Sequence, residues 1–204
     1  MLDSKIVEMY ERINIPQIYW YTHVKNIPEN AYKEVVVDWI QNFRAKLAEN
    51  KGLYIHGPYG SGKSAIAAML LRSGAAVGVF GLWVNYRQIA GFKINGDMFD
   101  EQETYYERML SVPLLVIDEV EFKTNKGFLV ETLEDIVRNR TQKRRPTVLT
   151  SNHSTKYLAE LSESNDKEGR VIHSQISGLL GVFPEAFSPL YVYGRNFRTN
   201  PVEK

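Results

Sequence analysis

The sequence has 204 residues, of which 44% are hydrophobic, and carries 25 Lys and Arg against 24 Asp and Glu, with no cysteine. This length and composition fit one globular domain with its own core and exclude general disorder. The absence of cysteine excludes disulfide scaffolds, thiolate metal sites and a cysteine nucleophile, and the net charge of +1 excludes a globally basic nucleic-acid binder.

The first thirty residues predict a short segment that differs from the rest of the chain. Apolar residues at helical spacing indicate one or two helical turns within the first thirteen positions. Pro16 and Pro28 then favour an irregular or extended path. We therefore expect residues 1–30 to form an N-terminal segment and residues 31–204 to form the main domain.

Helices and strands alternate in the remaining sequence. Apolar residues recur every three or four positions over residues 33–49, which predicts an amphipathic helix that ends near Asn50–Gly52. Later helices are predicted at Lys63–Arg72, Asp100–Leu110, Phe128–Arg140 and Gly169–Leu180, and strands at Leu53–His56, Gly81–Tyr86, Leu114–Ile117, Thr147–Thr150 and Leu190–Tyr193. Most of these strands are apolar throughout, which is typical of a parallel sheet covered on both faces. We predict a three-layer α/β fold with a central parallel sheet and a small C-terminal helical element.

The turn after the first strand matches the phosphate-binding pattern G-x-x-x-x-G-K-[ST] at every position. Its glycines leave the backbone N–H groups free to surround phosphate oxygens, and the following helix points its positive end at them. Lys63 is expected to contact the β- and γ-phosphates, and the Ser64 hydroxyl to ligate Mg²⁺. An ordinary glycine-rich turn has no need for this Lys-Ser pair. The predicted nucleotide-binding residues are Gly57, Pro58, Tyr59, Gly60, Ser61, Gly62, Lys63, Ser64 and Ala65.

Two acidic residues follow the apolar strand at residues 114–117. At the carboxyl end of a central parallel strand, a side chain lies where ligands of open α/β sheets bind. We expect Asp118 to hold Mg²⁺ through water and Glu119 to polarise the attacking water. Adjacent acids at a strand end can also cap the next helix, but together with a complete phosphate loop they favour a hydrolase over a small nucleotide kinase.

A third polar position follows the strand at residues 147–150. Asn152 is able to hydrogen-bond both the attacking water and the γ-phosphate, and so to respond to the loss of that phosphate. An asparagine at this place also suits a turn or a helix N-cap. The order of the strands is what favours the catalytic role.

The phosphate loop, Asp118-Glu119 and the segment Pro146–Asn152 together resemble the AAA+ P-loop ATPases that load replicative helicases, the DnaC/DnaI group, and their relative IstB of transposition. Asn14–Trp20 looks like that group's Ile-Pro-x-x-Tyr/Phe segment, and Gly52–Pro58 looks like its approach to the phosphate loop. The resemblance covers most of the chain, from about residue 13 to residue 198.

This resemblance implies an ATPase that uses ATP and Mg²⁺ in DNA replication. It implies a replicative hexameric helicase and single-stranded DNA as partners, a possible homo-oligomer, residues 31–204 as the AAA+ domain, and residues 1–30 as a possible helicase contact. The apolar runs are shorter than the roughly 20 residues of a membrane span, so we expect no membrane partner and a cytoplasmic protein of a bacterial or phage-infected cell. Two rival functions are an IstB-like transposition or DNA-remodelling ATPase and a nucleotide-switched helicase-binding module with little turnover.

The resemblance also concerns arginines that would stabilise charge on the γ-phosphate. Near the C-terminus the family has an aromatic-Arg pair, matched here by Phe197-Arg198, with Arg195 as a close alternative. The family places a second arginine, which acts on the neighbouring subunit, where this sequence has Gln175. Arg170 lies a little over one helical turn earlier. The departure at Gln175 implies slow hydrolysis or a partner that completes the site.

The sequence signals for DNA contacts are less specific than those for nucleotide binding. The sequence has one dense cluster of basic residues, which is either a contact to the DNA backbone or a solvated helix end. Within this cluster, Arg140 is also a candidate for contact with a neighbouring subunit. The cluster comprises Arg138, Arg140, Lys143, Arg144 and Arg145. Three aromatic residues before the main domain are candidates for packing on adenine, for stacking on nucleic-acid bases, or for the core or an interface, namely Tyr19, Trp20 and Tyr21. A mixed aromatic and basic group is a candidate contact to single-stranded DNA, namely Tyr86, Arg87, Phe92 and Lys93. The four histidines lack metal-ligand spacing, so we expect no metal besides nucleotide-bound Mg²⁺.

Overall fold

A computed structural model of the chain describes residues 2–89, 91, 100–122, 127–163 and 170–193. Its centre is a five-stranded sheet in the order β2-β3-β4-β1-β5, in which every neighbouring pair is parallel. The strands are β1 (Gly52–His56), β2 (Leu82–Asn85), β3 (Leu115–Val120), β4 (Thr147–Ser151) and β5 (Phe187–Tyr191).

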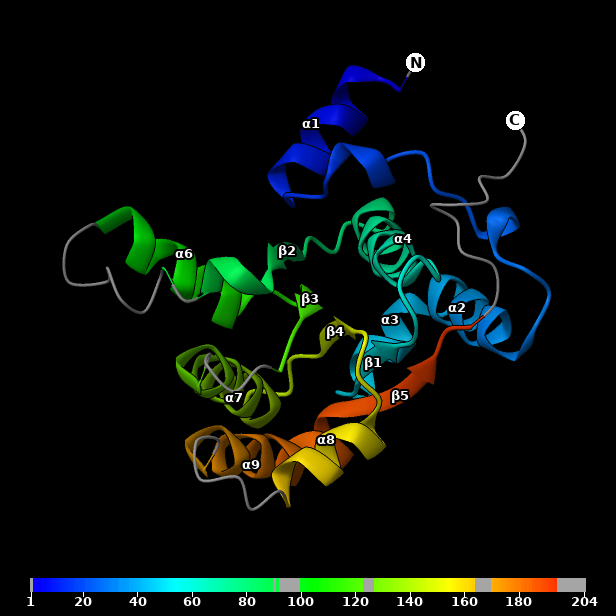
Figure 1. The fold of residues 1–204 in the computed structure, drawn as a ribbon. Helices are drawn as coiled ribbons and strands as arrows, with labels where there is room; N and C mark the ends of the chain where they lie inside the picture. The colour runs from blue at the N-terminus through cyan, green and yellow to red at the C-terminus, as the bar shows by residue number, and fades with distance from the viewer. Residues whose placement is uncertain (1, 90, 92–99, 123–126, 164–169, 194–204) are drawn as a thin grey trace.

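Helices cover both faces of this sheet (Figure 1). The α-helices are α1 (Ser4–Arg12), α2 (Ala31–Gln41), α3 (Phe43–Ala48), α4 (Lys63–Ala76), α6 (Asp100–Ser111), α7 (Gly127–Gln142), α8 (Thr155–Ser162) and α9 (Arg170–Ala186). Short 3-10 helices are η1 (Gln17–Tyr19), η2 (Val24–Asn26) and η3 (Tyr86–Gln88). Within the described residues, none of these helices has the length and apolarity needed to cross a lipid bilayer.

Alternate residues of the strands divide the interior into two cores. Ile55 and Val116 face α2, α3, α4 and the N-terminal segment, whereas Tyr54 and Ile117 face α6, α7, α8 and α9. Side chains of a strand point alternately to opposite faces, so an all-apolar strand buries both sets. The predicted three-layer fold with a central parallel sheet is confirmed.

The single helix predicted over residues 33–49 is wrong, because the chain breaks at Asn42 into α2 and α3. Asn42 has φ −109° and ψ 29°, and its side-chain amide donates to the Asp38 carboxylate at 2.7 Å. Asparagine side chains compete with helical backbone bonding in this way. The apolar spacing continues across the break and conceals it.

The C-terminal part of the chain holds one more helix than the sequence predicted. Helix α8 begins after Ser154, whose side-chain oxygen accepts the Tyr157 amide at 3.1 Å as an N-cap. Helix α9 continues through Pro184 to Ala186, beyond its predicted end at residue 180, and β5 therefore begins at Phe187 instead of residue 190.

The N-terminal segment packs against the edge strand β2. Ile13 is fully buried in the same core as α4, and its carbonyl accepts the Trp83 amide at 2.9 Å. Asn14 adopts a left-handed φ of 61°, and its side-chain amide donates to the Trp83 carbonyl at 2.9 Å. The segment thus satisfies backbone groups of β2 that would otherwise lie open at the sheet edge.

The basic cluster does not form one surface. Arg140 is 0% exposed, and its guanidinium donates to the carbonyls of Met109, Val112 and Pro146 and to the Thr147 hydroxyl, at 2.7 to 3.0 Å. Burial lowers the pKa of Arg140 to about 9. The suggestion that Arg140 contacts DNA or a neighbouring subunit is therefore wrong, because its side chain ties α7 to the end of α6 and the start of β4.

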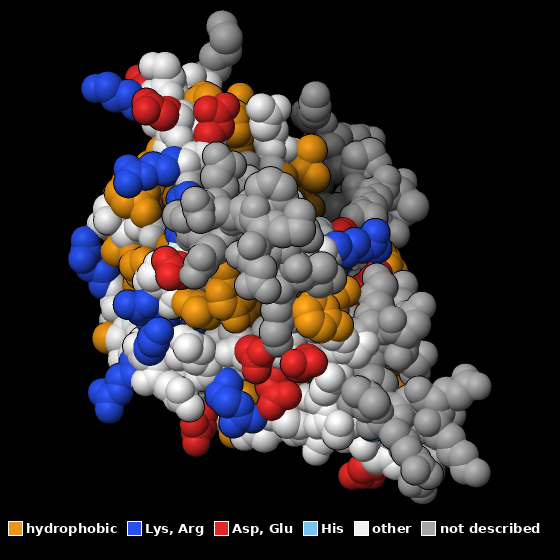
Figure 2. Space-filling model, turned by 90° about the vertical axis from the view of Figure 1, so that its left-hand side faces the viewer, with side chains coloured by type: hydrophobic (Ala, Val, Ile, Leu, Met, Phe, Trp, Pro, Cys, Tyr) orange, Lys and Arg blue, Asp and Glu red, His pale blue; other side chains and the backbone are white. Residues whose placement is uncertain are grey.

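Two other arginines of the basic cluster also have partners within the protein. Arg145 donates to the Leu110 carbonyl at 2.8 Å, and Arg138 pairs with Glu134 one helical turn away. Figure 2 shows basic, acidic and hydrophobic side chains interspersed on the side of the molecule that lies to the left in Figure 1. The view gives no support to a continuous basic DNA track on this face.

Candidate functional site

The phosphate-loop sequence forms a tight turn between β1 and α4. Gly60 and Gly62 have φ values of 74° and 96°, which glycine adopts without steric cost. A Cβ atom on Gly57 would lie 2.0 Å from the Val192 carbonyl oxygen, so a side chain is excluded there. Helix α4 begins directly after Gly62 and directs its free N-terminal amides at the turn. This backbone suits a group of phosphate oxygens.

Lys63 lies over the loop, with a largely buried side chain. Its ammonium donates to the carbonyls of Gly57 at 2.9 Å and Pro58 at 2.7 Å. Those contacts hold the Lys63 ammonium within the turn. Phosphate oxygens bound there would compete with the two carbonyls for its three N–H donors.

A buried carboxylate and two hydroxyls meet at the ends of β3, β4 and α4. Asp118 is 5% exposed and accepts a hydrogen bond from the Thr150 hydroxyl, which in turn accepts the Glu119 amide at 2.9 Å. Burial raises the pKa of Asp118, and hydrogen bonds from Thr150 and Ser64 oppose that rise. Carboxylate and hydroxyl oxygens are the ligands that Mg²⁺ prefers, so Ser64 and Asp118 fit the predicted metal site.

Glu119 leaves the sheet in an unusual backbone conformation. Its φ of 60° is left-handed, and the pairing of β3 with β4 shifts between Ile117 and Val120. A bulge of this kind redirects a side chain at a strand end. The exposed Glu119 carboxylate consequently extends beyond the sheet edge and accepts the side-chain amide of Asn85 at 3.1 Å.

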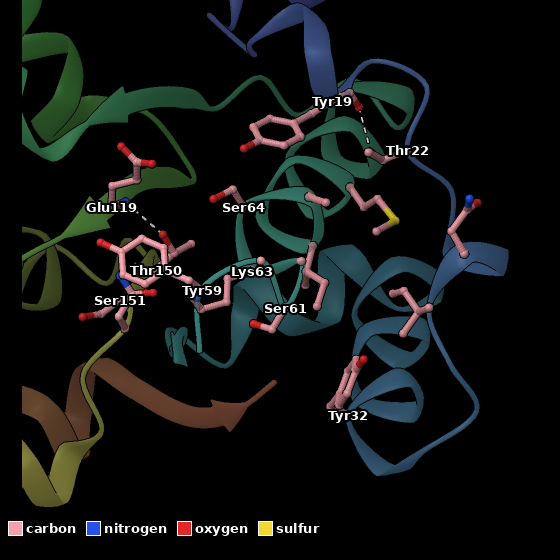
Figure 3. A pocket seen from close by; sticks show the side chains of 18 of the residues that line it. Tyr19, Thr22, Tyr32, Tyr59, Ser61, Lys63, Ser64, Glu119, Thr150 and Ser151 are labelled. Carbon is pink, nitrogen blue, oxygen red and sulfur yellow. Dashed lines mark hydrogen bonds between the residues drawn. The ribbon is translucent and has the colours of Figure 1, made fainter. Parts of the chain in front are cut away.

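These groups line one pocket of about 280 Å³ (Figure 3). The phosphate loop from Tyr59 to Ala65, Glu119 and Asn152 contribute to its wall. The turn that carries Asn152 is held by the Ser151 hydroxyl, which donates to Val120 and accepts the His153 amide. The structure therefore brings Lys63, Ser64, Glu119 and Asn152 together on the pocket wall, and Asp118, which does not line this pocket, is hydrogen-bonded to Ser64 and Thr150.

The other end of the pocket is more apolar. Ile27, Tyr32 and Met69 line it together with the polar side chains of His23 and Asn26. Apolar walls with a few polar groups are typical of pockets that hold a planar base. This end is built largely by the N-terminal segment and α2, and the phosphate end by the loops of the sheet.

A second and wider groove of about 540 Å³ meets the pocket at its phosphate end. The groove runs between the segment Asn14–Trp20 and the carboxyl ends of β2 and β3, where Asn85 and Asp118 line it. Tyr19 and Glu119 line both the groove and the pocket.

The polar residues that hold Glu119 in place were not predicted as site residues. Thr150 connects Asp118 to Glu119, and Asn85 holds the Glu119 carboxylate. Asn85 lies directly beside Asp118 in the register of β2 and β3. The signal was available, since Asn85 is a polar residue at the carboxyl end of a predicted strand of the same sheet.

Several other candidates lie away from the pocket. Gln175 is partly buried on α9 and does not line it, whereas Arg195 and Arg198 fall outside the described residues, as do Phe92 and Lys93. Of the aromatic candidates, Tyr86 and Trp20 are buried and unable to stack on a nucleic-acid base, which corrects that interpretation. Tyr19 lines the pocket, and Tyr21 is 69% exposed.

Comparison with known proteins agrees with this geometry at the level of the fold. No protein-family model matches the chain, and no curated protein matches its sequence. Among solved structures, the DnaC helicase loader aligns with 87% of this chain and 100% of its own, at 21% identity and a TM-score of 0.69. DnaI aligns with 90% of this chain and 94% of its own, at 20% identity and a TM-score of 0.65.

A third solved structure is the replication initiator DnaA bound to AMPPCP and single-stranded DNA. It aligns with 89% of this chain and 52% of its own, at 15% identity and a TM-score of 0.62. At these identities the similarity shows that the chain shares the fold of these replication proteins.

Proposed function

We propose that this protein binds ATP with Mg²⁺ and hydrolyses it. The observation that carries the proposal is the convergence of Lys63, Ser64, Glu119 and Asn152 on one pocket, with the buried Asp118 beside Ser64. A phosphate loop alone would suit any nucleotide-binding protein. A carboxylate that lines the same pocket from β3, two strands away from β1, adds a base for water.

The chemistry follows from the positions of these groups. The loop amides and Lys63 bind the β- and γ-phosphates, and the apolar end with Ile27, Tyr32 and Met69 takes the base. Ser64 and Asp118 would hold Mg²⁺, which neutralises phosphate charge when bound. Glu119 accepts a proton from the attacking water, and the Asn152 side chain hydrogen-bonds that water and the γ-phosphate.

The biological role that we propose is loading of a replicative hexameric helicase during DNA replication, with single-stranded DNA as a second partner and assembly into a homo-oligomer. Its support is the similarity to DnaC and DnaI over most of the chain, and to a DnaA structure that holds AMPPCP and single-stranded DNA. Residues 1–30 are the proposed helicase contact, residues 31–204 the ATPase domain, and Arg198 the arginine that acts on the γ-phosphate. Such a protein would act in the cytoplasm of a bacterial or phage-infected cell.

The partner is tested by co-purification from the native host with ATP, ADP or no nucleotide, with Lys63→Ala as a control that weakens phosphate binding. We expect to recover a hexameric helicase in an amount that depends on the nucleotide. With the Lys63 variant, the amount of helicase recovered should no longer depend on the nucleotide. Recovery of a transposase would instead support the IstB-like function. A helicase bound equally in all conditions would contradict nucleotide-dependent loading.

A second candidate function is a nucleotide-switched helicase-binding module with little turnover. Gln175, at the position where the family's second arginine would lie, favours it. The Asn85 amide on the Glu119 carboxylate also favours it, because this hydrogen bond occupies a carboxylate oxygen that would otherwise be open to the attacking water.

Asn85→Ser tests how that hydrogen bond affects turnover. Serine retains a cap for η3, where the Asn85 side-chain oxygen accepts the Arg87 amide at 3.0 Å, but removes the amide that holds Glu119. We expect ATP turnover without DNA or helicase to rise about fivefold, the equivalent of about 1 kcal/mol for one released hydrogen bond. Steady-state phosphate release measures this change. A fall in turnover would mean that Asn85 orients Glu119 productively.

A further inference from the structure

Tyr19 stands at the junction of the two cavities. Together with Glu119, it lines both the nucleotide pocket and the wider groove. In Figure 3 the Tyr19 ring lies above the start of α4, and its hydroxyl points toward the side where the Ser64 hydroxyl and the Glu119 carboxylate lie, away from Tyr32. The phenol is therefore directed at the phosphate end of the pocket.

The backbone of Tyr19 is fixed from three directions. Its amide donates to the Pro16 carbonyl at 2.9 Å, and its carbonyl accepts the Thr22 hydroxyl at 2.8 Å and the Arg72 guanidinium at 3.1 Å. Arg72 lies on α4, the helix that begins at the phosphate loop. The backbone of Tyr19 is thus tied to the helix that follows the phosphate loop.

The ring of Tyr19 is supported as well. It packs against Trp83 of β2 with ring centroids 5.7 Å apart, and β2 is itself bonded to Ile13 and Asn14 of the N-terminal segment. A side chain held by its neighbours does not have to be ordered when substrate binds, so its donor is already in position for reaction.

We propose that the Tyr19 hydroxyl is a further catalytic group, which donates a hydrogen bond to a γ-phosphoryl oxygen during hydrolysis. This inference rests on the proposed ATPase function. In the reaction, the water oxygen bonds to the γ-phosphorus, the bond from that phosphorus to the β–γ bridging oxygen breaks, and the water proton passes to Glu119. Tyr19 acts only as a hydrogen-bond donor and keeps its proton throughout.

The position of Tyr19 explains why the hydroxyl would act on transfer more than on binding. Charge spreads over the γ-phosphoryl oxygens as the group transfers, and a fixed donor stabilises that arrangement more than the ground state. Tyr19 and Glu119 also line the wider groove, so the proposed donor and the proposed base lie together at the end of the pocket that meets this groove.

Tyr19→Phe removes the hydroxyl alone and tests the proposal in the full chain. We expect kcat to fall about 10- to 100-fold, the usual effect of one lost hydrogen bond to a charged group, with the Kd for Mg·ATP within about twofold of the parent. Tyr21→Phe is the matched control, because Tyr21 lies two residues away and lines neither cavity. It should leave both constants and the melting temperature unchanged.

A second measurement does not depend on turnover. Binding of ADP with Mg²⁺ and aluminium fluoride, which imitates the phosphoryl group in transfer, should weaken in Tyr19→Phe by the same factor as kcat, and binding of Mg·ADP should not change. Equal kcat in the variant and the parent would overturn the proposal, and so would a weaker Kd for ATP at unchanged kcat, which would assign Tyr19 to nucleotide binding. A parent protein that fails to hydrolyse ATP would overturn the proposed ATPase function first, so the two failures are distinguished by the parent alone.

Discussion

Replacement of Glu119 by glutamine is expected to lower the rate of ATP hydrolysis about a hundredfold or more, the usual contribution of a positioned general base. Glutamine has the same shape but no basic oxygen, so it is unable to take the proton of the attacking water. The Glu119 backbone conformation and the Thr150 contact to its amide do not involve the carboxylate, and the pocket should persist. Mg·ATP binding should therefore remain close to that of the parent.

Single-turnover hydrolysis and calorimetric titration with Mg·ATP separate the two quantities. Glu121→Gln is a suitable control, since Glu121 lies two residues further on, pairs with Arg87 and lines neither cavity. If Glu119→Gln and the parent hydrolyse ATP equally slowly, with and without DNA and helicase, the enzyme interpretation fails. The nucleotide-switched module then becomes the better account.

Arg140→Met is expected to reduce the free energy of unfolding by about 3–5 kcal/mol, because several buried acceptors would lose their donor at a cost of about 1 kcal/mol or more each. Methionine fills much of the volume but leaves three carbonyls and the Thr147 hydroxyl without the guanidinium. Because these acceptors belong to the end of α6 and the start of β4, the contact between α6 and the sheet should loosen.

Denaturant unfolding of both variants measures the effect. Arg138→Met is the matched control on the same helix, where an exposed pair with Glu134 contributes at most about 1 kcal/mol. A loss below that level in Arg140→Met would show that neighbouring groups or water replace the guanidinium. Equal losses in the two variants would show that the buried contacts add nothing.

The sequence predicted the phosphate loop and the strand-end acids because their chemistry is encoded in short runs of residues. Gly57–Ser64 needs only its own glycines, a preceding strand and a following helix, and all three are visible locally. The parallel sheet likewise follows from apolar strands between helices. Such features can be predicted without knowledge of long-range contacts.

The residues that escaped prediction depend on contacts between distant segments. Arg140 looks like an ordinary member of a basic run until α6 and β4 surround it. Asn85 acquires its role only when β2 is registered against β3. Tyr19 was one of several aromatic candidates, and its place at the pocket depends on contacts with α4 through Arg72 and with β2 through Trp83. The break at Asn42 depends on whether its side chain or the helical backbone supplies the local hydrogen bonds, and the spacing of apolar residues carries no information on this.

The docking of the N-terminal segment on β2 has a practical consequence for work with shortened versions of this protein. A chain trimmed to start at residue 31 would lose Ile13 and Asn14 from the outer strand, as well as one wall of the nucleotide pocket. The uncovered backbone would then be free to recruit strands from other molecules. Insolubility of such a truncation would reflect the loss of a segment against which residues 31–204 pack, rather than an inherently unstable enzyme.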